Sequence, residues 1–402
     1  MKVAYYSPLA PDRSGISDYS ALLLPALREH VEVDVARKGA RARGDVALYH
    51  VGNNPESHGW IVEQLRREPG VVVLHDYVLH HLVAGMTLGR KDGPGYLSAM
   101  ERDAGVAGRL LGLGVIDGCI PPLWEVRPED FPLCGEVLDL ATGVIVHSRF
   151  VEERVREKGF AGPVWHVPHP AWPPPDVSPE RIGGAPVIGA FGNMNPSKRV
   201  PQLLDAFERF RESQPDAKLL LVGAAAPGFD LAWRIGHEGL ADAVVQHDYV
   251  DEERLWALMA GVDVVASLRS PTMGETSGTA IRALTLGKPL VVSDVGWFSE
   301  LPDAAAAKVR PDDREVDELV AAFEHVTANR DAMGTAAAEL SRAHDVARVA
   351  DLYVAALEES FGGDAVRETV LRELSESAAE VGIGAASDEA AALGQAMDEI
   401  QL

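Results

Sequence analysis

Residues 271–296 read PTMGETSGTAIRALTLGKPLVVSDVG, an order that predicts a small-residue turn, a short helix and a buried strand. A Gly-Lys-Pro break at 287–289 ends the helix. Gly274 and Gly278 let the backbone approach a ligand, and the free N–H groups of the following helix suit a phosphate. Glu275 beside those amides could accept hydrogen bonds from sugar hydroxyls. The pattern is typical of a nucleotide-sugar site, although a tight helix–strand connection without any ligand accounts for it equally well on its own.

The composition is that of a globular protein long enough for two domains. The chain has 402 residues, 47% of them hydrophobic, and a net charge of −24 from 61 acidic and 37 basic residues. This charge argues against nucleic acid or an anionic membrane as a partner, and no apolar run is long enough for a membrane span. Cys119 and Cys134 lie outside any metal-binding spacing, and no signal peptide is recognisable. We therefore expect a cytoplasmic protein with free thiols and no zinc site.

Apolar strands alternate with helices over residues 1–170. We expect helices near 18–29, 58–67 and 150–158, and strands near 2–6, 31–36, 46–50, 71–74, 144–147 and 164–166. Alternation of this kind predicts a parallel α/β sheet, and therefore a Rossmann-like first domain.

A break rich in proline, HPAWPPP at residues 169–175, separates this domain from a second one. The alternation then restarts, which predicts a second Rossmann-like domain over residues 171–345. A helix over 346–361 is expected to return to the first domain, and 362–402 is an acidic tail rich in Ala and Glu, for which we expect marginal helices and partial disorder. Because ligands of such sheets bind at the carboxyl ends of the strands, the site is expected between the domains.

The loop at 271–296 resembles the donor-site loop of retaining glycosyltransferases of family 4. In that family a Glu and a Gly-rich turn are followed by a second Glu and then by Ala-x-x-x-Gly-x-Pro-Val-Val. When the two patterns are aligned at their amino ends, Glu275 and Gly278 match. When they are aligned at their carboxyl ends, the matching residues are Ala283, Gly287, Pro289 and Val291. The middle is one residue short. Arg282 stands where the family has the second Glu, which holds ribose hydroxyls, and an arginine cannot accept those hydrogen bonds.

This resemblance covers residues 1–361 and implies the GT-B fold, with two doubly wound, Rossmann-like domains facing each other across a cleft. It implies a retaining hexosyltransferase that moves a sugar from a nucleoside-diphosphate donor to a hydroxyl acceptor. The nucleotide sugar would be a co-substrate, with no further cofactor and no metal. The leaving phosphate itself would take the proton of the acceptor.

A second matching segment, GAFGNMNPSKRVPQLLDAF, opens the second domain at residues 189–207. It resembles the Gly-Arg-x-x-x-x-Lys-Gly segment of the family, with Gly192 and Lys198 in place, Asn193 at the Arg position and Arg199 at the second Gly. Lys198 is expected to neutralise the leaving diphosphate, and Arg199 to supply a second positive charge. Two cations at a helix start are unfavourable without an anion nearby, which favours a binding role over a solvated pair.

Two segments of the first domain fall where the resemblance places the other half of the site. SPLAPDRSGISDYS, residues 7–20, carries Gly15, which would meet the donor phosphate or the attacking hydroxyl, and Ser17 could cap the following helix. A long first loop without a ligand is the alternative.

The segment VVVLHDYVLHHL, residues 71–82, places His75 directly after a buried strand. The resemblance implies that His75 contacts the transferring sugar and that Asp76 orients it or touches the acceptor. A metal site formed with His80 and His81 is the alternative, but no further carboxylate or thiol stands at ligand spacing.

The remaining candidates have weaker signals. Tyr249 at the end of a strand could stack on the nucleobase or simply pack, and Asn53 and Asn54 follow another strand end as candidates for acceptor recognition. Thr276 and Ser277 belong to the donor loop. We therefore predict His75, Glu275 and Lys198 as the catalytic residues, with the donor-binding residues Gly15, Gly192, Asn193, Lys198, Arg199, Tyr249, Glu275, Thr276, Ser277, Gly278 and Arg282.

Two other functions stay open at this point. An epimerase acting on a nucleotide sugar would use His75 and Asp76 as its acid–base pair. A non-catalytic protein that binds a nucleotide sugar or a polysaccharide is favoured if Asn193 and Arg282 abolish the donor contacts.

Overall fold

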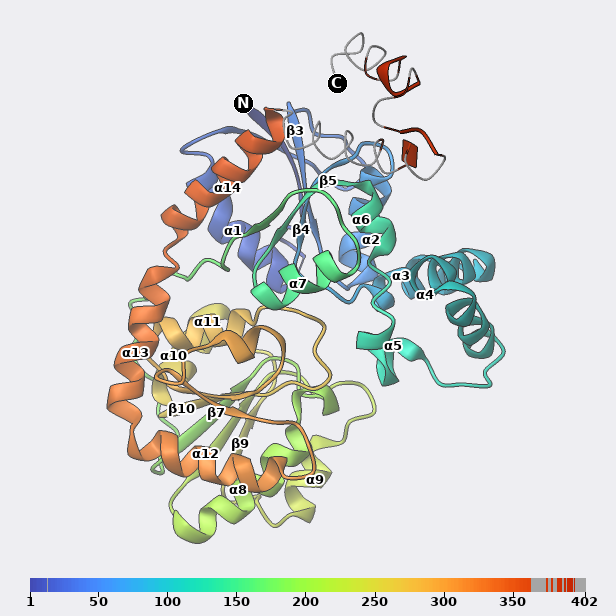
Figure 1. The fold of residues 1–402 in the computed structure, drawn as a ribbon. Helices are drawn as coiled ribbons and strands as arrows, with labels where there is room; N and C mark the ends of the chain where they lie inside the picture. The colour runs from blue at the N-terminus through green and yellow to red at the C-terminus, as the bar shows by residue number, and fades with distance from the viewer. Residues whose placement is uncertain are drawn as a thin grey trace.

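A computed structural model of the chain describes residues 1–12 and 14–362 and, beyond them, 374, 377, 378, 382–384, 387, 389–392 and 394. The described residues form two α/β domains, one above the other in Figure 1. The expected marginal helices and disorder of the tail fall mostly outside the described residues.

The first domain is built on a parallel sheet with the strand order β2-β1-β3-β4-β5-β6. These strands are β1 (Lys2–Tyr6), β2 (Glu32–Val35), β3 (Val46–Val51), β4 (Gly70–Leu74), β5 (Ala141–Val146) and β6 (Val164–His166). The central strands β3 and β4 are buried along their whole length, because helices cover both faces of the sheet. Their nearly continuous apolar runs follow from this double burial.

Helices α1 (Gly15–Leu27), α2 (Pro55–Leu65) and α7 (Arg149–Glu157) connect these strands. Helix α1 begins at Gly15, three residues earlier than predicted, because the side chain of Ser14 accepts a hydrogen bond from the Ser17 N–H. Ser14 is therefore the cap, and the prediction that Ser17 caps this helix is wrong.

The segment between β4 and β5 forms a helical insertion that was not predicted. Its elements are α3 (His80–Met86), η1 (Leu88–Arg90), α4 (Gly93–Ile116), α5 (Leu123–Val126), η2 (Pro128–Asp130) and α6 (Gly135–Leu140). Figure 1 shows α4 and α5 standing off the side of the first domain. Helix α4 is interrupted at Ala104 and Gly105, whose backbone angles are not helical.

The second domain repeats the architecture with the strand order β12-β11-β10-β7-β8-β9. Its strands are β7 (Val187–Phe191), β8 (Lys218–Val222), β9 (Val244–His247), β10 (Val264–Ser267), β11 (Leu290–Ser293) and β12 (Ala306–Val309). Its helices are η3 (Pro196–Lys198), α8 (Val200–Ser213), α9 (Leu231–His237), α10 (Glu252–Gly261), α11 (Gly278–Thr285), η4 (Gly296–Glu300), α12 (Glu315–Ala328) and α13 (Arg330–Ala343). The strand order reverses at β7, which marks the point where such sheets bind ligands.

Helix α14 (Val346–Phe361) runs back from the second domain and packs against α1 of the first (Figure 1). The hydroxyls of Tyr19 and Tyr353 lie 2.6 Å apart at this contact, where both side chains are buried. The start of the chain and its last long helix thus share one core.

The domains meet at the carboxyl ends of both sheets. The contacts across the interface include Val78 N–H to Met273 O (2.9 Å), Thr272 N–H to Glu129 Oε1 (2.8 Å), Arg149 and Phe150 N–H to the Glu300 carboxylate, and Arg282 to Asp18 (3.1 Å). At Gly274 the approach is close enough to require glycine. Its φ is +79°, and a Cβ at this position would lie 2.7 Å from the Cβ of Tyr77.

We predict that Gly274→Ala destabilises the protein more than the matched change Gly228→Ala. Gly228 has a similar φ of +81°, but a Cβ there would meet no atom within 4 Å. Both substitutions lower the free energy of unfolding by about 1–2 kcal/mol, because they place a side chain in the left-handed region. The clash with Tyr77 adds roughly 1–3 kcal/mol at Gly274 alone. Denaturant unfolding of the two variants measures the difference. An equal decrease in the free energy of unfolding for both variants would show that Tyr77 moves aside without a cost in stability.

Candidate functional site

Lys198 places a largely buried ammonium group at the carboxyl edge of the second sheet. Its Nζ donates a hydrogen bond to the backbone carbonyl of Phe191 (3.0 Å), at the end of β7. Gly192 follows with a φ of +95°, which favours glycine, and a Cβ on it would force Nζ of Lys198 to move. The pKa of Lys198 is lowered to about 7, first by burial and then by the nearby Arg269, while Glu275 acts against both. A cation in this position is stabilised by any anion that enters.

Arg269 and Glu275 complete a charged cluster with Lys198. Arg269 follows β10, and its Nε lies 2.6 Å from Oε1 of Glu275. The other carboxylate oxygen of Glu275 accepts hydrogen bonds from the Met273 N–H (2.7 Å) and the Thr272 hydroxyl (3.3 Å). The donor loop is therefore folded around its own glutamate. Arg269 is not among the predicted site residues, although its place just after an apolar strand was an available signal.

The N-terminus of α11 opens beside this cluster. Ser277 caps the helix by accepting the Ala280 N–H (3.2 Å), and Gly278 is its first residue. The buried hydroxyl of Thr276 has no hydrogen-bond partner among the described residues. Lys198, Arg269, Ser277 and Thr279 line a cavity at this point. Two cations, a helix N-terminus and hydroxyl groups are the chemistry that binds phosphate.

Arg199 does not join this cluster. Its guanidinium forms a forked ion pair with the carboxylate of Glu315, which is buried at the start of α12. In this structure Glu315 holds the guanidinium of Arg199, and a second charge from Arg199 at the ligand stays a prediction. Arg269 is the arginine that stands beside Lys198.

Arg282 is buried among three segments of the chain, which contribute Trp172, Asp18 and Glu252. Only 7% of it is exposed, its guanidinium lies 3.9 Å from the ring centre of Trp172, and it pairs with Asp18 (3.1 Å) and Glu252 (3.6 Å). Asp18 belongs to the first domain and Glu252 to α10. The arginine at the position of the family glutamate thus gathers two carboxylates and joins the domains.

Other predicted residues have structural tasks or lie at the surface. The amide oxygen of Asn53 accepts the Leu82 N–H (3.1 Å), and that of Asn54 caps α2 through the Glu56 N–H (2.8 Å). The predicted donor contacts Gly15, Asn193 and Tyr249 are exposed, Tyr249 to 66%. The amide oxygens of Asn53 and Asn54 are thus engaged within the first domain, and donor contacts by Gly15, Asn193 and Tyr249 stay predictions.

Buried histidines occupy the facing edge of the first domain. They are His50 at the end of β3, His75 after β4, His147 after β5 and His169 after β6. Tyr19 contacts all four rings, and His75 Nε2 lies 2.9 Å from His50 Nδ1. The sequence analysis identified His75 alone. The shared signal, a histidine at the end of each strand, becomes visible once the strand order is known.

Backbone carbonyls fix the tautomers of His147, His169 and a further buried histidine, His58 of α2. Nδ1 of His58, His147 and His169 lies 2.8–3.1 Å from a carbonyl oxygen, which can only accept, so this nitrogen carries the proton. Burial lowers the pKa of His58 and of His147 to about 4. These buried imidazoles are thus neutral near pH 7, opposite the cations of the second domain.

Asp76 lies between these two halves. Its Oδ2 accepts the Asn53 N–H (2.7 Å), and burial raises its pKa to about 7, with Glu275 across the interface adding to the effect. His80 is buried between the Phe131 carbonyl (2.8 Å) and the Tyr96 hydroxyl (2.9 Å), as a packing residue would be. Among the described residues, no cluster of His, Cys, Asp and Glu has the arrangement of a metal site.

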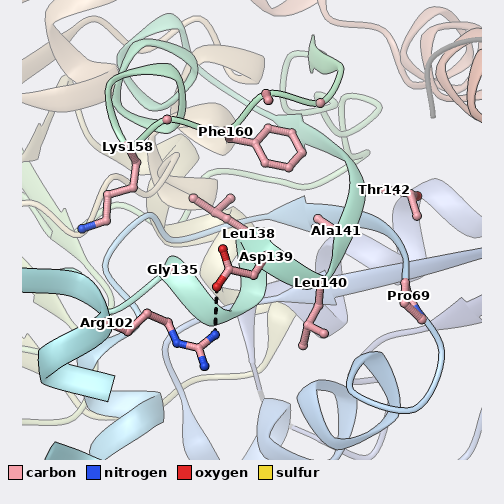
Figure 2. Close-up of a pocket in the computed structure, with 13 residues that line it drawn as sticks. Pro69, Arg102, Gly135, Leu138, Asp139, Leu140, Ala141, Thr142, Lys158 and Phe160 are labelled. Carbon is pink, nitrogen blue, oxygen red and sulfur yellow. Dashed lines mark hydrogen bonds and ion pairs between the residues drawn. The ribbon is translucent and has the colours of Figure 1, made fainter. Parts of the chain in front are cut away.

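A separate pocket lies at the amino ends of β4, β5 and β6, on the far edge of the first sheet (Figure 2). Its charged side chains are already paired, Arg102 with Asp139 (2.8 Å) and Lys158 with Asp103 (3.0 Å). We therefore do not include this pocket in the candidate site.

A protein-family match covers most of the second domain. Residues 185–329 match the family model described as glycosyl transferases group 1. A comparison with curated proteins by sequence gives no match.

Solved structures match over almost the whole chain. Sucrose-phosphate synthase from Thermosynechococcus elongatus has a TM-score of 0.61 at 18% identity, over 90% of this chain and 99% of that one. HepE from Anabaena, in complex with UDP, has a TM-score of 0.58 at 16% identity, over 89% of this chain and 100% of that one. The pneumococcal O-GlcNAc transferase GtfA, in complex with UDP and GlcNAc, has a TM-score of 0.53 at 13% identity, over 78% and 57% of the two chains.

The chain has the GT-B fold. At these identities the likeness establishes the architecture, and it confirms the prediction of two facing Rossmann-like domains. Within the described part of the chain, none of the helices combines the length and the apolar character that crossing a membrane requires.

We predict that the buried histidines make the protein sensitive to mild acid. A histidine with a lowered folded pKa contributes full stability above about pH 6.5, and this is lost as the pH falls towards the folded value near 4. For one such histidine the loss between pH 7.5 and 5 is about 2 kcal/mol. His147→Asn, whose amide can still donate to the Val167 carbonyl, should lose correspondingly less than wild type in urea unfolding at the two pH values. An identical loss would mean that His147 titrates normally.

Proposed function

We propose that this chain is a retaining glycosyltransferase of family 4, which moves a hexose from a nucleoside-diphosphate donor to a hydroxyl acceptor. The observation that carries the proposal is the pair of partly buried cations, Lys198 and Arg269, at the N-terminus of α11. It lies inside the region that matches the group 1 model and faces the first domain. HepE and GtfA, which share the fold, were solved with UDP, and a diphosphate is the group that these charges suit.

The cluster provides for the departure of a diphosphate. As the bond from the anomeric carbon to the leaving oxygen breaks, negative charge grows on the diphosphate, and fixed positive groups stabilise it. Lys198 is at the edge of losing its charge without a ligand, with a pKa of about 7, so a bound anion would restore the protonated form. This supports a mechanism without a metal, because the charges that a metal would supply come from the chain itself.

The donor sugar would lie between Glu275 and His75. Glu275 is held by Arg269 and by the backbone of its own loop, so its carboxylate is positioned before any ligand binds. His75 is buried with its Nε2 bound to His50, which orients its ring. A substitution on one face of the sugar, with retention and without a covalent intermediate, fits this arrangement. We also propose that the enzyme works in the cytoplasm and needs no cofactor beyond the nucleotide sugar.

Lys198→Met should abolish binding of the donor diphosphate. A ligand that binds the folded state raises the melting temperature, so a thermal-shift panel of UDP, GDP, ADP and dTDP with wild type identifies the nucleotide. The matched control is Lys288→Met, because Lys288 is also a partly buried lysine, bound to the Ala260 and Val262 carbonyls (2.7 and 2.8 Å) away from the cluster. It should lower stability and keep the shift. No shift with any diphosphate in wild type would overturn the proposal in favour of a protein that does not use nucleotide sugars.

Glu275→Gln should lower turnover on the order of 100-fold, because a charged acceptor at the sugar is replaced by a neutral one. The fold should survive, since the amide oxygen can still accept the Met273 N–H. Steady-state turnover of the donor identified above is the measurement, and the control is Glu318→Gln, a half-buried glutamate paired with Arg310. Unchanged turnover in Glu275→Gln would remove this residue from the sugar site.

A further inference from the structure

We propose that the second domain carries a second anion site, a basic groove formed by Arg181, Lys288, Arg330 and Arg342, which binds a small, water-soluble phosphorylated molecule. The basic groove lies at the amino ends of β7, β10 and β11, whereas the cluster around Lys198 lies at the carboxyl edge of the same sheet. The two sites are therefore separate. The inference goes beyond the proposed function and does not depend on it.

Two adjoining cavities form the basic groove. Their volumes are about 600 and 690 Å³, and both are lined by Arg181, Asp263, Lys288 and Arg330. Arg342 of α13 lines the first of them. Cavities of this size hold small-molecule ligands. None of the large apolar side chains that are exposed in the described part of the chain lines either cavity, which favours a polar ligand over a lipid.

Lys288 holds the centre of this positive charge in place. Its Nζ donates hydrogen bonds to the carbonyl oxygens of Ala260 (2.7 Å) and Val262 (2.8 Å). An ammonium group has three protons, so one donor remains for a ligand. The pKa of Lys288 is lowered, mainly by burial, and Arg330 and Arg181 act in the same direction, while Asp263 opposes them. Both guanidinium groups are thus close enough to repel the ammonium group.

The acidic side chains of the basic groove do not neutralise it. Asp263 has both oxygens engaged, since Oδ1 pairs with Arg330 (2.8 Å) and Oδ2 accepts the backbone N–H that begins β7 (2.8 Å). Asp331 pairs with the same arginine (3.2 Å). Arg181 and Arg342 form no ion pair with any residue that the structure describes. In a chain with a net charge of −24, this groove therefore gathers positive charge that an anion would compensate.

A buried hydroxyl group in the same groove also lacks a partner. Thr327, near the end of α12, lines the larger cavity, and its Oγ1 is buried without a hydrogen-bond partner among the described residues. Leaving a buried hydroxyl group unpaired costs free energy. The groove thus presents guanidinium, ammonium and hydroxyl donors together. Phosphate oxygens accept hydrogen bonds from all three, and a doubly charged phosphate matches several cations better than a single carboxylate does.

The test is binding of inorganic pyrophosphate to Lys198→Met, measured by isothermal titration calorimetry, because this variant disables the donor cluster. It should still bind pyrophosphate. Adding Arg181→Ala and Arg342→Ala should weaken that binding about tenfold or more, because two uncompensated charges leave the groove. Both side chains are exposed, so the fold should survive, and the melting temperature without ligand checks this.

The matched control adds Arg37→Ala and Lys38→Ala to Lys198→Met. These two exposed residues of the first domain carry the same total charge, and their loss should leave pyrophosphate binding within about twofold. An equal loss of affinity in the two triple variants would overturn the inference, because bulk charge would then explain the binding. Unchanged affinity after removal of Arg181 and Arg342 would overturn it as well.

Two further outcomes would contradict a site for a soluble phosphate compound. One is that Lys198→Met binds no pyrophosphate. The other is that it binds vesicles containing phosphatidylglycerol and not pyrophosphate, which would assign the groove to a lipid headgroup. The proposed function is decided separately, by the nucleotide panel with wild type, since the protein used here lacks the lysine of the donor cluster.

Discussion

The buried ammonium of Lys198 is the constraint on which the site depends. A cation at this depth lacks most of its hydration, so its neighbours decide whether it stays charged. The Phe191 carbonyl, the glycine at 192 and the carboxylate of Glu275 each make its position possible, and Arg269 opposes it. The arrangement leaves positive charge that is only partly compensated, and an anionic ligand removes the imbalance.

The first domain places buried histidines at the edge that faces this charge. His50, His75 and His147 are buried and have lowered pKa values, so they are neutral at physiological pH. Neutral imidazoles can donate to or accept from hydroxyl groups without repelling the cations across the interface. Charged groups and neutral imidazoles thus lie on different domains. This division of labour is what the facing arrangement of two Rossmann-like sheets makes possible.

Sequence alone revealed the parts of this site that are local. Lys198, Glu275 and Gly278 lie in contiguous motifs, and strands of four to six apolar residues mark the sheet edges from which they project. Arg269 and the partner of Arg199 were missed because they depend on distant residues. Glu315 is 116 positions away from Arg199 and comes close only because α12 packs against α8. The helical insertion was missed because its apolar residues pack against one another in a small separate core, so no single periodic face stands out.

The two departures from the family pattern, Asn193 and Arg282, are each accompanied by charged residues on other elements of the structure. Asn193 replaces an arginine in the sequence motif, and Arg269 brings a guanidinium to Lys198 from the next strand in the sheet, because β7 and β10 are neighbours. Arg282 replaces a glutamate, and it gathers the carboxylates of Asp18 and Glu252 around its own position. In both cases the charge that is missing at one position of the sequence is present nearby in space on another element. Because a ligand responds to the field at its binding site and not to the order of residues, a changed motif and a working site are compatible.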